Sequence, residues 1–142
     1  MRIKELFFDR KAVTSRVDKA TRKVLSRFGA FVRRTARRSI RPRKRTSAPG
    51  SPPSSHTGLL KRFIFFGYDP RPGKRSVVIG PQRLSQKGRG EAPSLLEHGG
   101  TTTLKRRGRR VRARFRGRPF MRPAFEKEQH QLPALWRNSV KR

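Results

Sequence analysis

The sequence predicts a single α+β domain, in which a mainly antiparallel sheet of about four strands packs on a long N-terminal helix. A C-terminal helix closes the predicted fold. Three observations support this class: a long helical stripe near the N-terminus, two pairs of short strand-like segments joined by turns, and a second helical pattern near the C-terminus. A length of 142 residues accommodates one such domain with one modest core.

Residues 11–40 are predicted to form one amphipathic helix. Its apolar stripe advances by three or four residues at each step and consists of Val13, Val17, Ala20, Val24, Phe28, Phe31 and Thr35. Arg41-Pro42 ends the helix, because the residue before a proline avoids the helical region. A coiled coil is the alternative use of this stripe, but the spacing lasts barely three heptads. We therefore favour packing on the protein's own sheet.

Residues 42–57 are predicted to form an extended loop, since they contain four prolines, several serines and few apolar side chains. Such a composition cannot bury enough apolar surface to order the segment alone. We therefore expect this loop to be mobile in the free subunit and ordered by a neighbouring chain.

The sheet is expected within residues 58–119. Segments 62–68 and 76–80 are rich in strand-forming residues and flank a turn at 69–73, which predicts a first hairpin. Residues 93–98 are expected to form a short helical turn that ends at Gly99-Gly100. Segments 101–105 and 111–116 predict a second hairpin with its turn at 107–109.

The second hairpin combines an apolar and a basic pattern on one strand. Val111, Ala113 and Phe115 alternate with Arg112, Arg114 and Arg116, which is typical of a half-buried strand with a charged outer face. We expect the three apolar residues to carry the packing of this strand on the core. Residues 120–142 are then assigned to a C-terminal helix and tail, with the helix over 122–137 kinked or shortened by Pro133.

The positive charge of the chain predicts a polyanionic partner or a crowded assembly. There are 39 Lys and Arg residues against 8 acids, giving a formal charge of +31. The densest basic block falls on the second hairpin, where the candidate contact residues are Arg106, Arg107, Arg109, Arg110, Arg112, Arg114 and Arg116. Such a ridge suits either the phosphates of DNA or an acidic surface of a neighbouring subunit, and the sequence leaves both open.

Enzymatic function is not predicted. The histidines His56, His98 and His130 are far apart in unlike contexts, there is no cysteine, and no nucleophile has a recognisable base nearby. We therefore predict no catalytic residue, no metal ligand and no cofactor. The longest apolar run, residues 63–66, is too short to span a membrane, and the start of the chain lacks the pattern of a signal peptide. These features indicate a soluble protein made inside a cell.

Four short segments stand out by their order along the chain. The first contains Thr57, Gly58 and Leu59, and the second ends a strand with Gly80 and Pro81. The third contains Ala92, Pro93, Glu97 and Gly99, and the fourth contains Arg118, Pro119, Phe120 and Pro123. Taken in this order, they resemble the tail-completion or head–tail joining family of tailed bacteriophages, and the match covers about residues 12–130. We expect these residues to maintain the fold: the glycines by permitting special backbone conformations, Glu97 by accepting hydrogen bonds, and Phe120 by filling the core.

The resemblance implies a structural protein of the virion neck that is assembled in the host cytoplasm. Its partners would be copies of itself in a ring, either a hexamer or a dodecamer, neighbouring phage connector and tail proteins, and double-stranded DNA in the lumen. The composition supports one rival from another class, a basic nucleic-acid-binding protein of ribosomal or nucleoid type. Salt-sensitive binding of the monomer to free DNA or RNA would favour that rival.

Overall fold

The computed structural model describes residues 10–71, 73–82, 92–137 and 139. Its elements follow the order α1 (Arg10–Ser39), β1 (Arg41–Pro42), β2 (Ser54–Ser55), α2 (Leu59–Arg62), β3 (Ile64–Asp69), β4 (Ser76–Pro81), α3 (Ala92–His98), β5 (Gly100–Arg106), β6 (Arg109–Phe115), α4 (Met121–Glu128), a 3-10 turn η1 (Gln129–Gln131) and α5 (Leu132–Arg137). The α+β class, the long N-terminal helix and the C-terminal helix are therefore confirmed.

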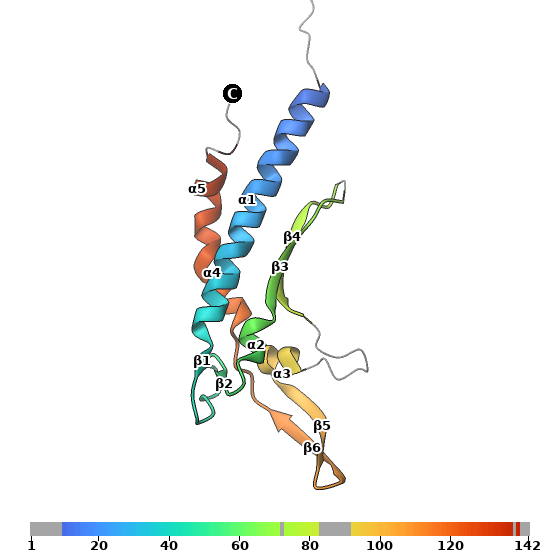
Figure 1. Ribbon diagram of the computed structural model, residues 1–142, viewed down its shortest axis with the longest axis vertical. Helices are drawn as coiled ribbons and strands as arrows, with labels where there is room; N and C mark the ends of the chain where they lie inside the picture. Colours follow the sequence, from blue (N-terminus) through green and yellow to red (C-terminus); the bar gives the residue numbers. More distant parts are fainter. Residues whose placement is uncertain (1–9, 72, 83–91, 138, 140–142) are drawn as a thin grey trace, which may run out of the picture.

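The prediction of one sheet of about four strands is wrong. The described residues form three separate two-stranded sheets: parallel β1–β2, antiparallel β3–β4 and antiparallel β5–β6. The reason is visible in Figure 1, where β3–β4 runs along α1 while β5–β6 extends away from the opposite end of the body, beyond α3. The two hairpins therefore have no shared edge along which to pair.

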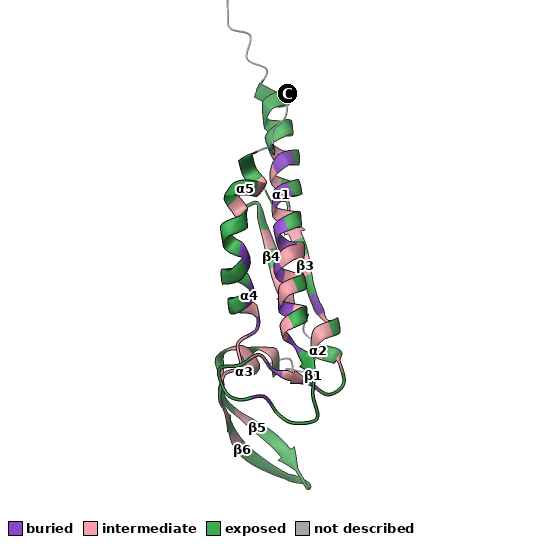
Figure 2. Ribbon diagram, turned by 90° about the vertical axis from the view of Figure 1, so that its left-hand side faces the viewer, coloured by how far each residue is buried: buried purple, intermediate pink, exposed green. Residues whose placement is uncertain are grey.

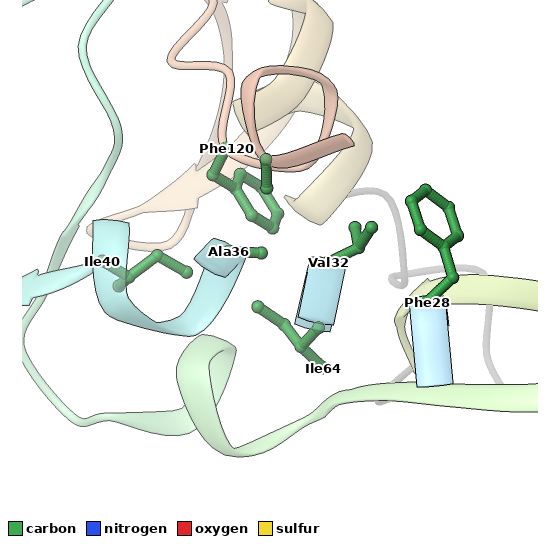
Figure 3. Packing of buried hydrophobic residues seen from close by; sticks show 7 residues of the cluster. Phe28, Val32, Ala36, Ile40, Ile64 and Phe120 are labelled. Atoms are coloured by element: carbon green, nitrogen blue, oxygen red, sulfur yellow. The ribbon is translucent and has the colours of Figure 1, made fainter. Parts of the chain in front are cut away.

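The body of the molecule has three layers, with α1 in the middle. Helix α4 and its continuation α5 contact one side of α1, and the β3–β4 hairpin contacts another (Figure 1). Figure 3 shows Phe120 and Ile64 reaching Ala36 of α1 from opposite directions. The largest fully buried side chains are Phe120, Ile40, Ile64 and Val32, so the core lies along the C-terminal half of α1.

The buried row of α1 differs from the predicted stripe. It advances by four residues at every step, through Ala20, Val24, Phe28, Val32 and Ala36, and continues to Ile40 beyond the helix. A step of four residues is slightly more than one helical turn of about 3.6 residues, so the buried row winds gradually around α1 and contacts both outer layers. Val13 and Val17, predicted to be buried, are exposed, and Phe31 and Thr35 are only half-buried. The first turns of α1 extend past the neighbouring elements, which explains the two exposed valines (Figure 1).

The β3–β4 hairpin packs closely against α1 at Gly29. A Cβ atom at this buried glycine would lie 2.8 Å from Cγ2 of Val77 and 2.9 Å from Cδ2 of Phe66. The first predicted strand begins two residues too early, because Arg62 and Phe63 donate backbone hydrogen bonds to Gly58 and Leu59 and so end helix α2.

The turn after β3 contains an ion pair between Asp69 and Arg71. The Arg71 side chain donates a hydrogen bond to the Asp69 carboxylate and lowers its pKa from the ordinary value. Both groups are in contact with solvent, and an exposed ion pair of this kind contributes little to the free energy of folding.

The segment predicted as an extended loop, residues 42–57, is irregular except for β1 and β2. Two of its hydrogen bonds join it to residues 117–118: Gly50 donates its backbone N–H to Gly117, and the Arg118 side chain donates to the carbonyl of Ser47. Ser47, Pro53 and Ser55 are buried. The expected ordering by a neighbouring chain stays a prediction.

The C-terminal helix is interrupted, as Pro133 predicted. A short 3-10 turn, Gln129–Gln131, separates α4 from α5, since Pro133 has no N–H to continue the helical hydrogen bonds. Glu128 at the end of α4 is buried and accepts hydrogen bonds from the hydroxyl of Thr35 and the amide of Gln131. In the described part of the chain, no helix is both long enough and apolar enough to cross a membrane.

Candidate polyanion-binding hairpin

The β5–β6 hairpin carries the highest density of positive charge. Its strands pair in register from Gly100↔Phe115 to Arg106↔Arg109, and they are joined by Arg107 and Gly108. Both turn residues have positive φ, 49° and 80°, which is the conformation of a type I′ turn and matches the twist of a two-residue hairpin. Figure 2 shows the hairpin projecting from one end of the body with mostly exposed residues.

The register divides the seven candidate arginines between two faces. Residues paired across antiparallel strands project to the same side, so Arg110, Arg112 and Arg114 lie opposite Lys105, Thr103 and Thr101 on one face. This set of Lys105, Arg110, Arg112 and Arg114 is called the basic face below. Arg106 and Arg109 lie at the tip of the other face, Arg107 lies in the turn, and Arg116 follows the end of β6. The structure therefore does not gather the seven arginines into one ridge.

The second face of the hairpin is apolar in its middle. It includes the cross-strand pairs Leu104↔Val111 and Thr102↔Ala113. Leu104 and Val111 are 44% and 47% exposed, and Ala113 and Phe115 are half-buried. The expectation that Val111, Ala113 and Phe115 carry the packing on the core is therefore wrong within a single chain, because the hairpin projects from the body and does not cover it.

Among the residues that the structure describes, no acid balances the charge of the hairpin. Two like-charged pairs lie directly across the strands, Lys105↔Arg110 and Arg106↔Arg109, and such pairs are destabilising. The described carboxylates are engaged elsewhere: Asp18 with Arg75, Asp69 with Arg71, Glu126 with Arg122, Glu128 with Thr35, and Glu97 with the backbone of α4. A polyanion at the tip would relieve this repulsion.

Glu97 fixes the base of the hairpin to the body. Its carboxylate accepts backbone hydrogen bonds from Phe120 (2.9 Å), Met121 (3.0 Å) and Arg122 (2.8 Å), which are among the free N–H groups at the start of α4. A negative charge is also favourable at this end of a helix. The predicted role of Glu97 as a hydrogen-bond acceptor is confirmed, although its donors lie at α4 and not at the Gly99-Gly100 turn. We call this set of contacts the Glu97 cap.

The two strands leave the body through a tight passage beside the Glu97 cap. Gly99 has a φ of 75°, and a Cβ atom there would lie 2.8 Å from the backbone nitrogen of Gly117. Arg118 donates its backbone N–H to Leu96 and its side chain to the carbonyl of Ser47. These contacts fix the point at which the hairpin leaves the body. No pattern in the sequence predicted the contacts between segments 96–99 and 117–122.

The remaining family-motif residues have structural positions. Gly58 has a φ of 75° at the start of α2, as expected, whereas Gly80 has no positive φ and the expectation of a special conformation there is wrong. Leu59 is exposed, Pro81 ends β4, and Ala92 and Pro93 begin α3. The Thr57 hydroxyl accepts the backbone N–H of Leu59 at 3.4 Å.

The fourth motif begins the C-terminal helix. Phe120 is fully buried, as expected, and directly precedes α4. Pro119 lies just outside the helix and Pro123 in its first turn, where the missing N–H costs no helical hydrogen bond.

The described residues contain no group of three or more His, Asp or Glu side chains that could hold a metal ion. Comparisons of the chain with protein-family models, with curated proteins and with solved structures each gave no match.

Proposed function

We propose that this protein is a structural subunit of the neck of a tailed-phage particle, forming a ring that joins head and tail and leaves a passage for DNA. The observation that carries the proposal is the set of four ordered sequence segments that resemble the head–tail joining family. Two of these segments meet at the Glu97 cap, where Glu97 of one binds the start of α4 in the other. Segments that are separate in the sequence thus act together as one structural unit.

The form of the subunit suits this role. A three-layered body carries one projecting, positively charged ribbon (Figure 1). In a ring every copy would present the same ribbon, so the basic face would be repeated around the axis. Arginines on a strand contact phosphates without reading base sequence, as a conduit for DNA of any sequence requires.

A second candidate function is a basic nucleic-acid-binding protein of ribosomal or nucleoid type. One observation favours it: the hairpin has no acidic partner among the described residues, although it carries two like-charged cross-strand pairs. Under this alternative the monomer would bind free RNA or DNA by itself, and the protein would co-purify with ribosomes or chromosomal DNA in place of particles.

The test is disruption of the gene in the phage or prophage that encodes it, with counting of particles by electron microscopy. The proposal predicts DNA-filled heads and separate tails in place of joined particles, and recovery when the intact gene is supplied from a plasmid. A plasmid copy with an early stop codon is the matched control for effects on neighbouring genes. Normal yields of tailed, infectious particles from the disrupted gene would refute the proposal.

A further inference from the structure

The β3–β4 hairpin has an outer face that the described residues cover only in part. Pairing in register places Ile64, Phe66 and Tyr68 with Pro81, Ile79 and Val77 on one side, which contacts α1 through Phe66 and Val77. The opposite side carries Phe65, Gly67, Val78 and Gly80, and this set is called the outer face below. Phe65 is 45% exposed and Val78 is 67% exposed.

The described residues give no packing reason for the two glycines of the outer face. Neither has a positive φ, and among the described residues a Cβ atom at Gly67 or Gly80 would meet nothing within 4 Å. Glycine weakens a strand relative to alanine, and inside a strand it often marks the close approach of another backbone or a bound molecule. Here the glycines leave a shallow hollow of about 410 Å³ bordered by Phe65 and Val78.

The strands that form the outer face are also nearly free of charge in a very basic chain, and the Arg33 guanidinium of α1 lies 5.9 Å from the centre of the Phe65 ring at the edge of this face. Strands β3 and β4 contain a single charged residue, Asp69, although the chain has 39 Lys and Arg residues. Proteins often place charged side chains on exposed strands, because these charges prevent pairing with strands of other chains. The β5–β6 hairpin follows that rule, and the β3–β4 hairpin does not. Another copy of this basic chain can therefore approach the outer face without meeting like charges on the strands.

The opposite layer of the body carries a matching apolar group. Trp136, the only tryptophan of the chain, lies at the end of α5 and is 40% exposed. Figure 1 shows α5 and the β3–β4 hairpin on opposite sides of α1, at neighbouring levels along the long axis. Tryptophan is enriched among residues that dominate interfaces, because its large ring fills a pocket.

From these observations we infer that the outer face of β3–β4 binds the α5 end of a second copy of this chain, with Trp136 entering the hollow above Gly67 and Gly80. The two surfaces differ and lie on opposite layers, so the contact is head-to-tail, and repetition of such a contact forms a ring when the rotation from one copy to the next closes. This inference rests on the ring-forming part of the proposed function and names the surfaces that would form the ring.

The test measures self-association of the intact chain by sedimentation, in salt high enough to screen the repulsion between copies. The variants are Gly67→Val, which fills the hollow, and Trp136→Ala, which removes the inserted side chain. Valine suits a strand, and the described residues leave room for it at Gly67, so this variant should melt no lower than the wild type. Val111→Ala on the other hairpin is the matched control, and it should associate as the wild type does.

We expect the wild type to form closed oligomers and each of the two variants to be monomeric. A mixture of the two variants should form dimers only, because one wild-type contact remains between them: Trp136 of the Gly67→Val chain and the intact hollow of the Trp136→Ala chain. Dimers in the mixture distinguish a head-to-tail contact from a symmetric one, in which the two surfaces would each meet themselves.

Three results would overturn the inference. A wild type that stays monomeric in high salt contradicts ring formation itself, and with it that part of the proposed function. Wild-type association that persists in Gly67→Val contradicts only the choice of surface. A lower melting temperature of Gly67→Val with unchanged association would show that the chain's own residues cover the hollow.

Discussion

Replacement of Glu97 by glutamine tests whether the Glu97 cap holds the base of the hairpin. The carboxylate accepts three backbone hydrogen bonds, two at Oε2 and one at Oε1. In Glu97→Gln one of these oxygens becomes an NH₂ group, which is itself a donor and cannot accept from a backbone N–H. At least one charge-assisted hydrogen bond is lost, together with the favourable interaction between a negative charge and the start of α4.

The magnitude follows from these two losses. A hydrogen bond to a charged group contributes about 1.5–3 kcal/mol, and a charge at a helix terminus about 0.3–1 kcal/mol. We therefore expect Glu97→Gln to lower the free energy of unfolding by about 2–4 kcal/mol, against a typical total of about 5–15 kcal/mol. At roughly 3 °C per kcal/mol for a chain of this size, Tm should fall by about 6–12 °C.

The assay is thermal unfolding followed by circular dichroism at fixed salt. Glu126→Gln is the matched control, since it makes the same chemical change four residues after Arg122 on the exposed face of α4. Exposed pairs at this spacing contribute about 0.3–0.5 kcal/mol, so the control should change Tm by no more than about 2 °C. Equal Tm values for the two variants would refute the structural role of Glu97.

Three further predictions concern charge and packing. First, the Tm of the wild type should rise with ionic strength. Its formal charge of +31 produces repulsion between basic side chains, and salt screens that repulsion beyond roughly 8 Å at physiological concentration. Thermal melts across a salt series measure this effect, and a constant Tm would contradict it. Second, replacing Arg110, Arg112 and Arg114 together by glutamine should leave Tm unchanged or raise it. The same change should reduce the salt dependence of duplex-DNA binding, measured by fluorescence anisotropy, by about three released counterions. An unchanged salt slope would show that the basic face does not contact phosphates. Third, Val111→Ala should lower the free energy of unfolding by less than about 1 kcal/mol and Val32→Ala by about 1–3 kcal/mol, because Val111 is 47% exposed and Val32 is 1% exposed. Equal decreases for the two variants in urea unfolding would show that the hairpin packs on the core.

Local patterns in the sequence predicted most of the elements of this fold. The helical spacing identified α1 within one residue at each end, and Pro133 predicted the interruption of the C-terminal helix. Strand-forming residues on both sides of a turn identified the first hairpin and alternating side chains the second, since strand propensity, strand period and turn residues are local properties. The buried row of α1 was predicted only in part, because which residues of a helix are covered depends on elements that arrive later in the chain.

The arrangement of the hairpins could not be predicted from these patterns. The alternation of Val111, Ala113 and Phe115 indicates one apolar face, but it does not say whether that face meets the chain's own core or another molecule. Likewise, the alternation along β6 could not assign Arg106 of β5 to the face opposite Arg110 and Arg112, since that assignment needs the pairing register. The Glu97 cap joins residues more than twenty positions apart, so no local signal indicated its donors.

The most direct test of the central claim is electron cryomicroscopy of the neck of particles produced with this gene. The proposed function and the inferred contact predict a closed ring of this chain between head and tail, with α5 of each subunit against β3–β4 of the next and the β5–β6 hairpins repeated around the DNA passage. Purified particles that lack the chain, or neck density that its three-layered body cannot fit, would contradict the account.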